Sequence, residues 1–187
     1  MIKHTSGNLL ESDAEALVNT VNCVGVMGKG IALQFKQAFS ENFKAYAKAC
    51  KAGEVRTGNM FIFGTGNMFN PKYIVNFPTK RHWKAKSRLD DIESGLADLI
   101  IQVEKLKITS IAIPPLGAGL GGLRWRDVRQ KIYDAFEDHS VQVLLYEPKG
   151  SPKADKIKIS TKKPNMQTSL IFNFFEAKFW TFWFKIL

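Results

Sequence analysis

The chain of 187 residues carries 27 lysines and arginines against 17 aspartates and glutamates, a formal net charge of +10, and 45% of its residues are apolar. That length suits one domain with an appendage, and that apolar fraction is enough for an ordinary core. Its two cysteines, Cys23 and Cys50, have neither metal-site nor redox-motif spacing, which excludes both classes and favours reduced cytoplasmic thiols. The basic charge favours a phosphate, a nucleic acid or an anionic membrane as partner, with a merely solvated basic surface as the alternative.

The two ends of the chain differ from its middle. The opening MIKHTSGNLL lacks an apolar h-region, so we expect no signal peptide. Residues 151–163 are lysine-rich and are predicted to be a linker, and residues 170–187 are rich in aromatic side chains. This aromatic segment is interpreted as a docking segment or the truncated start of a second module, with an interfacial membrane anchor or a reading-frame artefact as alternatives. The predicted domains are therefore 1–150 and a tail at 151–187.

Short β-rich runs alternate with helical patterns over residues 1–150. Strands are predicted at 16–22, 59–65, 72–78, 109–116 and 141–148, and helices at 30–50, 87–106 and 125–138. A turn at 66–71 joins the second and third strands. The strand at 109–116 has no polar face, so it is predicted to be central and parallel. Alternation of strands and helices predicts an α/β layered sheet.

Three loops of unusual composition follow strands of this sheet, at 19–30, 78–86 and 114–122. In open α/β sheets ligands bind at the carboxyl ends of the strands. Three such loops at one edge favour a binding site over three independent turns.

The first loop places Gly25, Gly28 and Gly30 before a predicted helix, whose free N–H groups and dipole favour an anion. A Walker A motif fails here, because Cys23 occupies the first glycine position and Gly30 the hydroxyl position. A Rossmann fingerprint fails because the order is G-x-x-G-x-G. Phosphate binding and a simple glycine-rich turn both remain open at this point.

A second glycine-rich loop is IPPLGAGLGG, residues 113–122. Its glycines serve either a tight turn or a concavity of successive N–H groups that binds an anion. Two such loops on neighbouring strands could hold both phosphates of a diphosphate.

The third loop, NFPTKRHWKAKSR at 76–88, interleaves basic and aromatic residues. Its cations are Lys80, Arg81, Lys84, Lys86 and Arg88, with His82 and Trp83 between them. Cations for phosphates and a ring for a base suit a nucleic-acid strand, and a solvated basic loop is the alternative. Lys80 closely follows a strand end, and a desolvated lysine can lose its proton and become a nucleophile or a base.

Together, the stretches GNLL, VNTVNCVGVMGKGIALQFK, NFPTKRHWK and IPPLGAGLGGLRW resemble a macrodomain, the ADP-ribose-binding α/β fold, over about residues 1–150. The lysine-bearing third loop is similar to that of the DNA ADP-ribosyl glycohydrolase antitoxins (DarG), relatives of the terminal ADP-ribose protein glycohydrolase of animals. The resemblance implies a three-layer α/β/α fold with a mixed, largely parallel sheet. It also implies removal of ADP-ribose from a DNA base, thymine or guanine, modified by a DarT-like toxin.

The same resemblance implies roles for individual residues. Asn8 and, less strongly, Tyr146 would lie near the adenine, and Asn22 near the distal ribose or the modified base. The implied ligand-binding residues are Asn8, Leu9, Asn19, Gly28, Lys29, Gly30, Ile31, Pro115, Leu116, Gly117, Ala118, Gly119, Leu120, Gly121 and Tyr146. The implied catalytic residues are Lys80 and Asn22, and the implied DNA-binding residues are Arg81, His82, Trp83 and Lys84.

Lys80 would attack the anomeric carbon of the distal ribose, stabilise charge there, or form a Schiff base with the opened sugar. The animal enzyme has an aspartate in its second loop, where this chain has Gly121 and no carboxylate. The expected partners are ADP-ribosylated single-stranded DNA and a cognate DarT-like toxin, with no membrane, cofactor or metal. A non-catalytic ADP-ribose reader and a glycohydrolase acting on protein are the alternatives. Residues 163–170 resemble the junction to a toxin-binding module.

Overall fold

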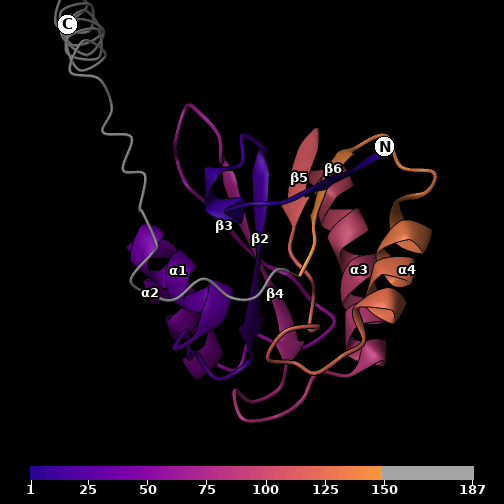
Figure 1. Ribbon diagram of the computed structural model, residues 1–187. Helices are drawn as coiled ribbons and strands as arrows, with labels where there is room; N and C mark the ends of the chain where they lie inside the picture. The colour runs from indigo at the N-terminus through magenta and orange to yellow at the C-terminus, as the bar shows by residue number, and fades with distance from the viewer. Residues whose placement is uncertain (149–187) are drawn as a thin grey trace, which may run out of the picture. The chain divides into compact units, whose positions relative to one another are not determined.

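The computed structural model describes residues 1–148, so the predictions for 151–187 lie outside the described residues. Six strands form one sheet in the order β1-β6-β5-β2-β4-β3 (Figure 1). They are β1 (Ile2–Thr5), β2 (Ala16–Asn22), β3 (Phe61–Gly64), β4 (Tyr73–Lys80), β5 (Ser110–Ile113) and β6 (Gln142–Tyr146). All neighbours pair in parallel except β3, which is antiparallel to β4. The predicted mixed, largely parallel sheet is confirmed.

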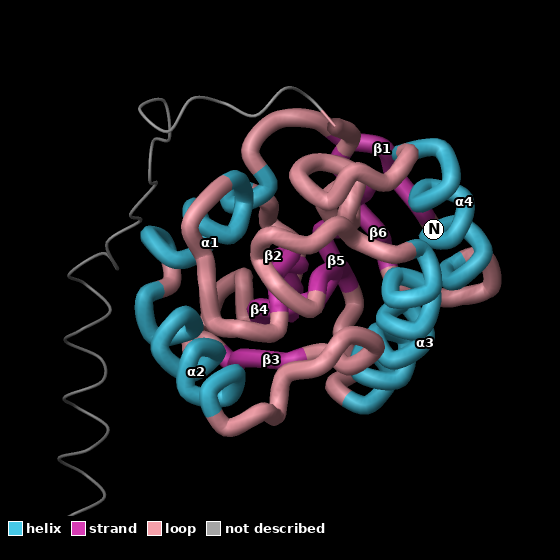
Figure 2. The backbone as a smooth tube through the Cα atoms, turned by 90° about the horizontal axis from the view of Figure 1, so that it is seen from below, coloured by secondary structure: helices cyan, strands magenta, loops and turns pink. Residues whose placement is uncertain are grey.

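Helices cover both faces of the sheet. They are the short 3₁₀ helix η1 (Leu9–Glu11) and the α-helices α1 (Gly30–Ala38), α2 (Ser40–Lys51), α3 (Leu89–Lys105) and α4 (Trp125–Phe136). Figure 2 shows α1 and α2 on one side of the strands and α3 and α4 on the other. The apolar faces of α3 and α4 form one core with β4, β5 and β6, and α1 and α2 pack in two smaller clusters. The predicted three-layer arrangement is confirmed.

The single helix predicted at 30–50 is wrong, because Phe39 has φ −131° and ψ 71° and separates α1 from α2. The break divides the aromatic stripe between two clusters. Phe35 and Phe39 pack around Ile74, whereas Tyr46 packs with Val21. A straight helix would hold all these rings on one face. Because the two apolar clusters lie in different places, one straight helix cannot reach both.

Two further differences concern strands. The first strand, β1, has no counterpart among the predicted elements, and it pairs with β6 from the opposite end of the described chain. The strand predicted at 109–116 covers only β5, although its central, parallel position between β6 and β2 is confirmed. Among residues 1–148, no helix is long and apolar enough to cross a membrane.

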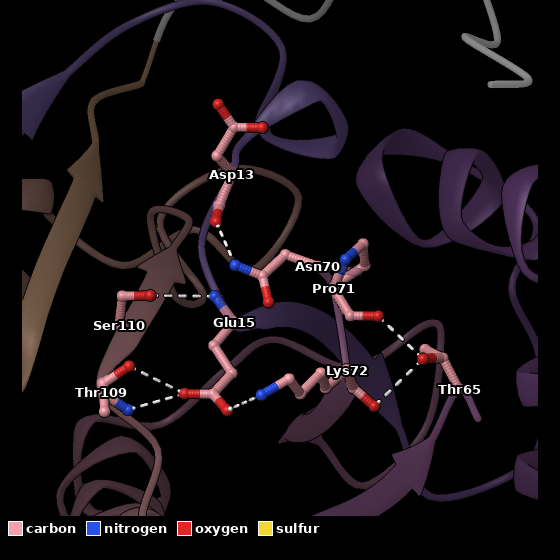
Figure 3. A network of polar contacts seen from close by, with 8 residues as sticks. All are labelled: Asp13, Glu15, Thr65, Asn70, Pro71, Lys72, Thr109 and Ser110. Carbon is pink, nitrogen blue, oxygen red and sulfur yellow. Dashed lines mark hydrogen bonds and ion pairs between the residues drawn. The ribbon is translucent and has the colours of Figure 1, made fainter. Parts of the chain in front are cut away.

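The amino ends of the three central strands are tied together by side chains (Figure 3). The Glu15 carboxylate, just before β2, accepts hydrogen bonds of 2.9 Å from both the N–H and the hydroxyl of Thr109 and one of 3.1 Å from Lys72 Nζ. The Glu15 N–H donates to Ser110 Oγ at 2.9 Å. Burial alone raises the pKa of Glu15, but these hydrogen bonds and the Lys72 charge lower it more, so the pKa lies below its ordinary 4.5.

Candidate active site

The carboxyl ends of β5, β2 and β4 are adjacent and parallel, so the loops that follow these strands meet at one edge of the sheet. Those loops are the three singled out in the sequence: 23–29 after β2, 81–88 after β4, and 114–122 after β5. Two hydrogen bonds link the end of β4 and its loop to the 114–122 loop: Lys80 Nζ donates to Leu120 O at 2.6 Å, and Ser87 N donates to Gly121 O at 3.0 Å. The start of α1 is also near this loop, because a β-carbon on Gly30 would lie 3.7 Å from Leu120 Cδ1.

The first loop is organised by Asn22, the last residue of β2. Its Oδ1 accepts hydrogen bonds from the N–H groups of Val24 and Val26, and its Nδ2 donates to Val26 O. The buried Tyr46 hydroxyl donates to Asn22 O at 2.6 Å. The side chain of Asn22 therefore shapes the loop that leads into α1. Sequence reasoning missed Tyr46, whose apolar helix-face position gave no sign of a polar contact.

Helix α1 begins without a cap. Lys29 occupies the N-cap position but makes no side-chain capping bond, and no acidic residue lies in the first turn. Within residues 1–148, the N–H groups of Gly30 and Ile31 donate to no acceptor. Free N–H groups and the helix dipole favour an anion at this point. Lys29 and Gly28 are exposed beside them.

The glycines of the 114–122 loop fall into two groups. A β-carbon on Gly121 would lie 2.1 Å from Gly117 O, and one on Gly117 would lie 2.9 Å from Ser87 Cβ. These two glycines are therefore required by the protein's own packing. Gly119, in contrast, has no atom within 4 Å of a β-carbon position and no positive φ. A glycine with open space before it keeps its backbone accessible to a ligand.

The tip of this loop also carries unpaired donors. Within the described residues, the N–H groups of Gly119, Leu120 and Gly121 donate to no acceptor. The Leu120 side chain is 69% exposed, whereas that of Leu116 is fully buried in the core. Pro115 and Ala118 are half-buried. Leu116 can therefore meet a ligand only through its backbone.

Lys80 stands at the end of β4, beneath the glycine-rich loop. Partial burial lowers the pKa of its amine below the ordinary 10.5, because desolvation disfavours the charged form. Its hydrogen bond to Leu120 O holds the amine at the junction of the loops. The site thus places a lysine with a lowered pKa beside two sets of free N–H donors.

The basic loop at 81–88 has one side chain paired with α3 and a group of side chains exposed to solvent. Arg81, predicted to bind DNA, forms a 2.8 Å ion pair with Asp91 in the first turn of α3, which fastens the loop. His82 and Trp83 stack with ring centroids 5.5 Å apart, and Lys84 Nζ lies 4.9 Å from the Trp83 centroid. Trp83 is 49% exposed. This stack presents an aromatic surface flanked by cations.

The side chain of Asn19, which was predicted to bind the ligand, lies inside the protein. It is fully buried, and its Nδ2 donates to Asn76 Oδ1 at 3.1 Å, while Asn76 Nδ2 donates to Asn42 Oδ1 at 2.7 Å. In the β2–β4 register Asn19 lies directly beside Asn76. The side chain therefore belongs to a buried amide cluster, in which its Oδ1 has no hydrogen-bond partner among the described residues.

The residues predicted to lie near the adenine are close to one another. Asn8 is the N-cap of η1, and its Oδ1 accepts from Leu10 N at 3.1 Å. Leu9, Tyr146 and Ile31 pack in one apolar cluster, so η1, the end of β6 and the start of α1 are neighbours. Leu9 is buried there, and Tyr146 is half-buried.

Two more residues of the site escaped sequence reasoning. Ser87 and Asp91 are both buried and both contact the loops, Ser87 beneath the glycine-rich loop and Asp91 against Arg81. A serine before a helix and an acid in its first turn are ordinary capping signals, which conceal such a role. Within the described residues, no group of three histidines, cysteines or acids could hold a metal ion.

Comparisons with known proteins identify relatives of this chain and of its fold. The chain is 52% identical over 167 residues to a DNA ADP-ribosyl glycohydrolase of Thermus aquaticus, covering 89% of this chain and 46% of that protein. Its structure is similar to the macrodomain of Mycobacterium tuberculosis DarG, with a TM-score of 0.79 and 57% identity over 80% of this chain and 99% of that chain. It also resembles Thermosipho africanus DarTG in complex with ADP-ribose, with a TM-score of 0.72 and 33% identity over 80% of this chain and 42% of that chain.

The chain thus spans less than half the length of the curated relative from Thermus aquaticus. In contrast, it covers almost the whole of the solved Mycobacterium tuberculosis macrodomain. Residues 18–132 match the family model described as Macro domain, and this match includes most of β2 and all of α1, β4 and β5, which carry the three loops. The chain therefore belongs to the macro domain family, and its described part is similar to the macrodomains of DarG proteins.

Proposed function

We propose that this protein binds ADP-ribose and hydrolytically removes it from ADP-ribosylated DNA bases. The observation that carries the proposal is the meeting of two sets of free N–H groups, at the start of α1 and at Gly119 and Leu120, with Lys80 at their junction. The names of the relatives support it, since the relative from Thermus aquaticus is called a DNA ADP-ribosyl glycohydrolase and one similar structure holds ADP-ribose.

The two sets of donors suit the two phosphates of the ligand. Backbone N–H groups at a helix N-terminus and in a glycine-rich loop favour the binding of oxyanions such as phosphates. Lys29 adds positive charge at the rim. In this binding mode the adenosine end lies toward Asn8 and Tyr146, and the distal ribose lies toward Asn22 and Lys80.

Lys80 is the proposed catalytic residue. Its neutral amine attacks the anomeric carbon of the distal ribose, the bond from that carbon to the base nitrogen breaks, and the base leaves with the electron pair and takes up a proton. The resulting amine adduct opens to a Schiff base, which water hydrolyses to free ADP-ribose and regenerated lysine. The lowered pKa of Lys80 increases the fraction of neutral amine available for this attack.

Asn22 has an indirect role in this proposal. Because its Oδ1 and Nδ2 bind the backbone of Val24 and Val26, its side chain fixes the loop before α1. Its predicted catalytic role is kept here as positioning of that loop around the distal ribose.

The exposed stack of His82, Trp83 and Lys84 is proposed to receive the DNA strand. A base stacks on the aromatic surface while cations neutralise neighbouring phosphates, and this requires unpaired bases, as in single-stranded DNA. Arg81 contributes by holding the loop against Asp91.

A cognate DarT-like toxin is the proposed biological partner, and the cytoplasm is the proposed location. The name of the Thermosipho africanus relative, a fusion of a DNA ADP-ribosyl transferase and a DNA ADP-ribosyl glycohydrolase, supports such a pairing. The two cysteines without a disulfide are compatible with a reducing compartment.

The experiment uses single-stranded oligonucleotides carrying one ADP-ribosylated thymidine or one ADP-ribosylated guanosine, and measures release of free ADP-ribose. Lys80→Ala is expected to lower turnover by about 10²- to 10⁴-fold and to keep ADP-ribose affinity within a few-fold of wild type. Lys80→Arg keeps the charge but offers no neutral amine, so it is expected to be equally inactive. Lys44→Ala, an exposed lysine of α2, is the matched control and is expected to act as wild type.

Normal turnover by Lys80→Ala would remove the catalytic assignment, and activity of Lys80→Arg would replace nucleophilic attack by charge stabilisation. Tight ADP-ribose binding with no release from either oligonucleotide would indicate a non-catalytic reader. Release from ADP-ribosylated protein in preference to DNA would indicate a protein-directed glycohydrolase.

A further inference from the structure

The tip of the glycine-rich loop is a four-residue turn, in which Gly122 N donates to Gly119 O at 3.1 Å. Leu120 and Gly121 are its two central residues. The two common forms of such a turn differ by rotation of the central peptide, and the rotated form requires a positive φ at the second central residue. Gly121 does not have a positive φ here, but as a glycine it can adopt one.

The peptide between Leu120 and Gly121 points its carbonyl at the catalytic amine, with 2.6 Å between Leu120 O and Lys80 Nζ. In this orientation the Leu120 carbonyl accepts the hydrogen bond of the Lys80 amine. The Gly121 N–H of the same peptide points in the opposite direction, away from Lys80. The peptides on both sides are fixed, because Gly119 O accepts from Gly122 N and Gly121 O accepts from Ser87 N. The central peptide is the one that is free to rotate.

Ser87 lies beside this peptide with an unused hydroxyl. Its side chain is buried, and its Oγ has no hydrogen-bond partner within residues 1–148. A β-carbon placed on Gly121 would lie only 2.3 Å from Ser87 Oγ. A buried hydroxyl without a partner destabilises a protein. An alanine at position 87 would remove the hydroxyl and its cost. We therefore expect the Ser87 hydroxyl to find a hydrogen-bond acceptor in another conformation of the 114–122 loop.

We propose that the Leu120–Gly121 peptide rotates when the diphosphate binds, and that Ser87 is the positioning residue that holds the rotated form. The Leu120 carbonyl leaves Lys80 and accepts the Ser87 hydroxyl. The Gly121 N–H turns into the site and donates to a phosphate, while Lys80 becomes free to meet the distal ribose. This inference rests on the proposed function, since ADP-ribose is the ligand that drives the rotation.

The test compares Ser87→Ala with Ser94→Ala, a matched serine on α3 whose hydroxyl is bonded to its own helix backbone. Three quantities are measured: ADP-ribose affinity by calorimetry, turnover of the ADP-ribosylated oligonucleotide, and the Gly121 amide resonance in ¹⁵N-glycine-labelled protein. Ser87→Ala is expected to weaken ADP-ribose binding by about 2- to 12-fold, the value of one hydrogen bond. It is also expected to lower kcat, to reduce the ligand-induced shift of Gly121, and to leave the melting temperature equal or higher.

Unchanged affinity and kcat in Ser87→Ala would overturn the inference while leaving the proposed function intact. A lowered melting temperature with an undiminished Gly121 shift would also overturn it, since Ser87 would then serve the fold alone. Failure of the wild-type protein to bind ADP-ribose would overturn the proposed function and the inference together. Ser94→Ala is expected to match wild type in all three measurements.

Discussion

The three central strands β2, β4 and β5 have two very different ends. At their amino ends, Glu15, Lys72, Thr109 and Ser110 pair with one another in a closed network (Figure 3). At their carboxyl ends, the N–H groups of Gly30, Ile31 and Gly119–Gly121 have no acceptor within residues 1–148. The same strands thus carry a satisfied edge and an unsatisfied edge.

The two ends of the strands serve different purposes: the amino ends contribute to stability, and the carboxyl ends are available for binding. A buried polar group with its partners in place contributes to folding, whereas a donor left free contributes nothing until a ligand supplies the acceptor. The free edge also gathers the positive charge of Lys29 and Lys80, and the closed edge neutralises Glu15 with Lys72. Substitutions at the two edges are therefore expected to separate ligand affinity from stability.

The largest effect is expected at the free edge, from Gly119→Val. Its branched side chain would cover the donors at the loop tip, and loss of one or more charge-assisted hydrogen bonds is expected to weaken ADP-ribose binding by about 10- to 150-fold. Stability is expected to change little, because a β-carbon at Gly119 meets no atom within 4 Å. Calorimetric titration and thermal melts measure the two quantities.

Gly64→Val is the matched control for this substitution. Gly64 also has open space and no positive φ, but it pairs with Tyr73 at the closed edge. Its ADP-ribose affinity is expected to equal that of wild type. Equal loss of ADP-ribose affinity in Gly119→Val and Gly64→Val would contradict the assignment of ligand binding to the carboxyl ends of the strands.

A smaller effect is expected from Trp83→Ala on DNA alone. Loss of a stacking surface worth about 1–3 kcal/mol per base is expected to weaken binding of the ADP-ribosylated oligonucleotide by about 5- to 150-fold and to leave free ADP-ribose affinity unchanged. Phe69→Ala is the control, since Phe69 is 76% exposed on the turn between β3 and β4, near the closed edge. Loss of oligonucleotide affinity in Phe69→Ala alone would place the DNA on the wrong edge.

At the closed edge, Glu15→Gln is expected to lower the free energy of unfolding by about 1–3 kcal/mol, because a buried carboxylate loses its charge while Lys72 and Thr109 remain. ADP-ribose affinity is expected to be unchanged. Denaturant unfolding gives the first quantity and calorimetry the second. Glu41→Gln, at an exposed pair with Lys44, is the control and is expected to stay within about 0.5 kcal/mol of wild type.

The effect of Glu15→Gln is also expected to depend on pH. The folded-state pKa of Glu15 lies below its ordinary 4.5, so the carboxylate stabilises the fold fully above pH 4.5. That contribution is lost as pH falls through the lowered pKa. Wild type and Glu15→Gln should therefore converge in stability at acidic pH, and a constant difference down to pH 2 would show that charge is not the cause.

Much of the fold was predictable because the apolar periodicities are local. Runs such as 16–22 and 72–78 are rich in apolar residues, and their alternation with helical patterns predicts an α/β layered sheet. The break at Phe39 was not predictable, because the phenylalanine spacing fits one helix and only the positions of two separate clusters divide it. Strand β1 escaped because its partner, β6, lies at the far end of the described chain.

The sequence by itself determined the chemistry of the site: three loops, their glycines, and a lysine close to the end of a strand. Tertiary structure decided how each residue is used. Asn19 is enclosed because strand register sets it beside Asn76, and Arg81 is held because α3 brings Asp91 to it. Gly117 and Gly121 serve packing against Ser87, while Gly119 stays open. Residue type fixes what a side chain can do, but burial and partners come from segments distant in sequence, which no local pattern contains.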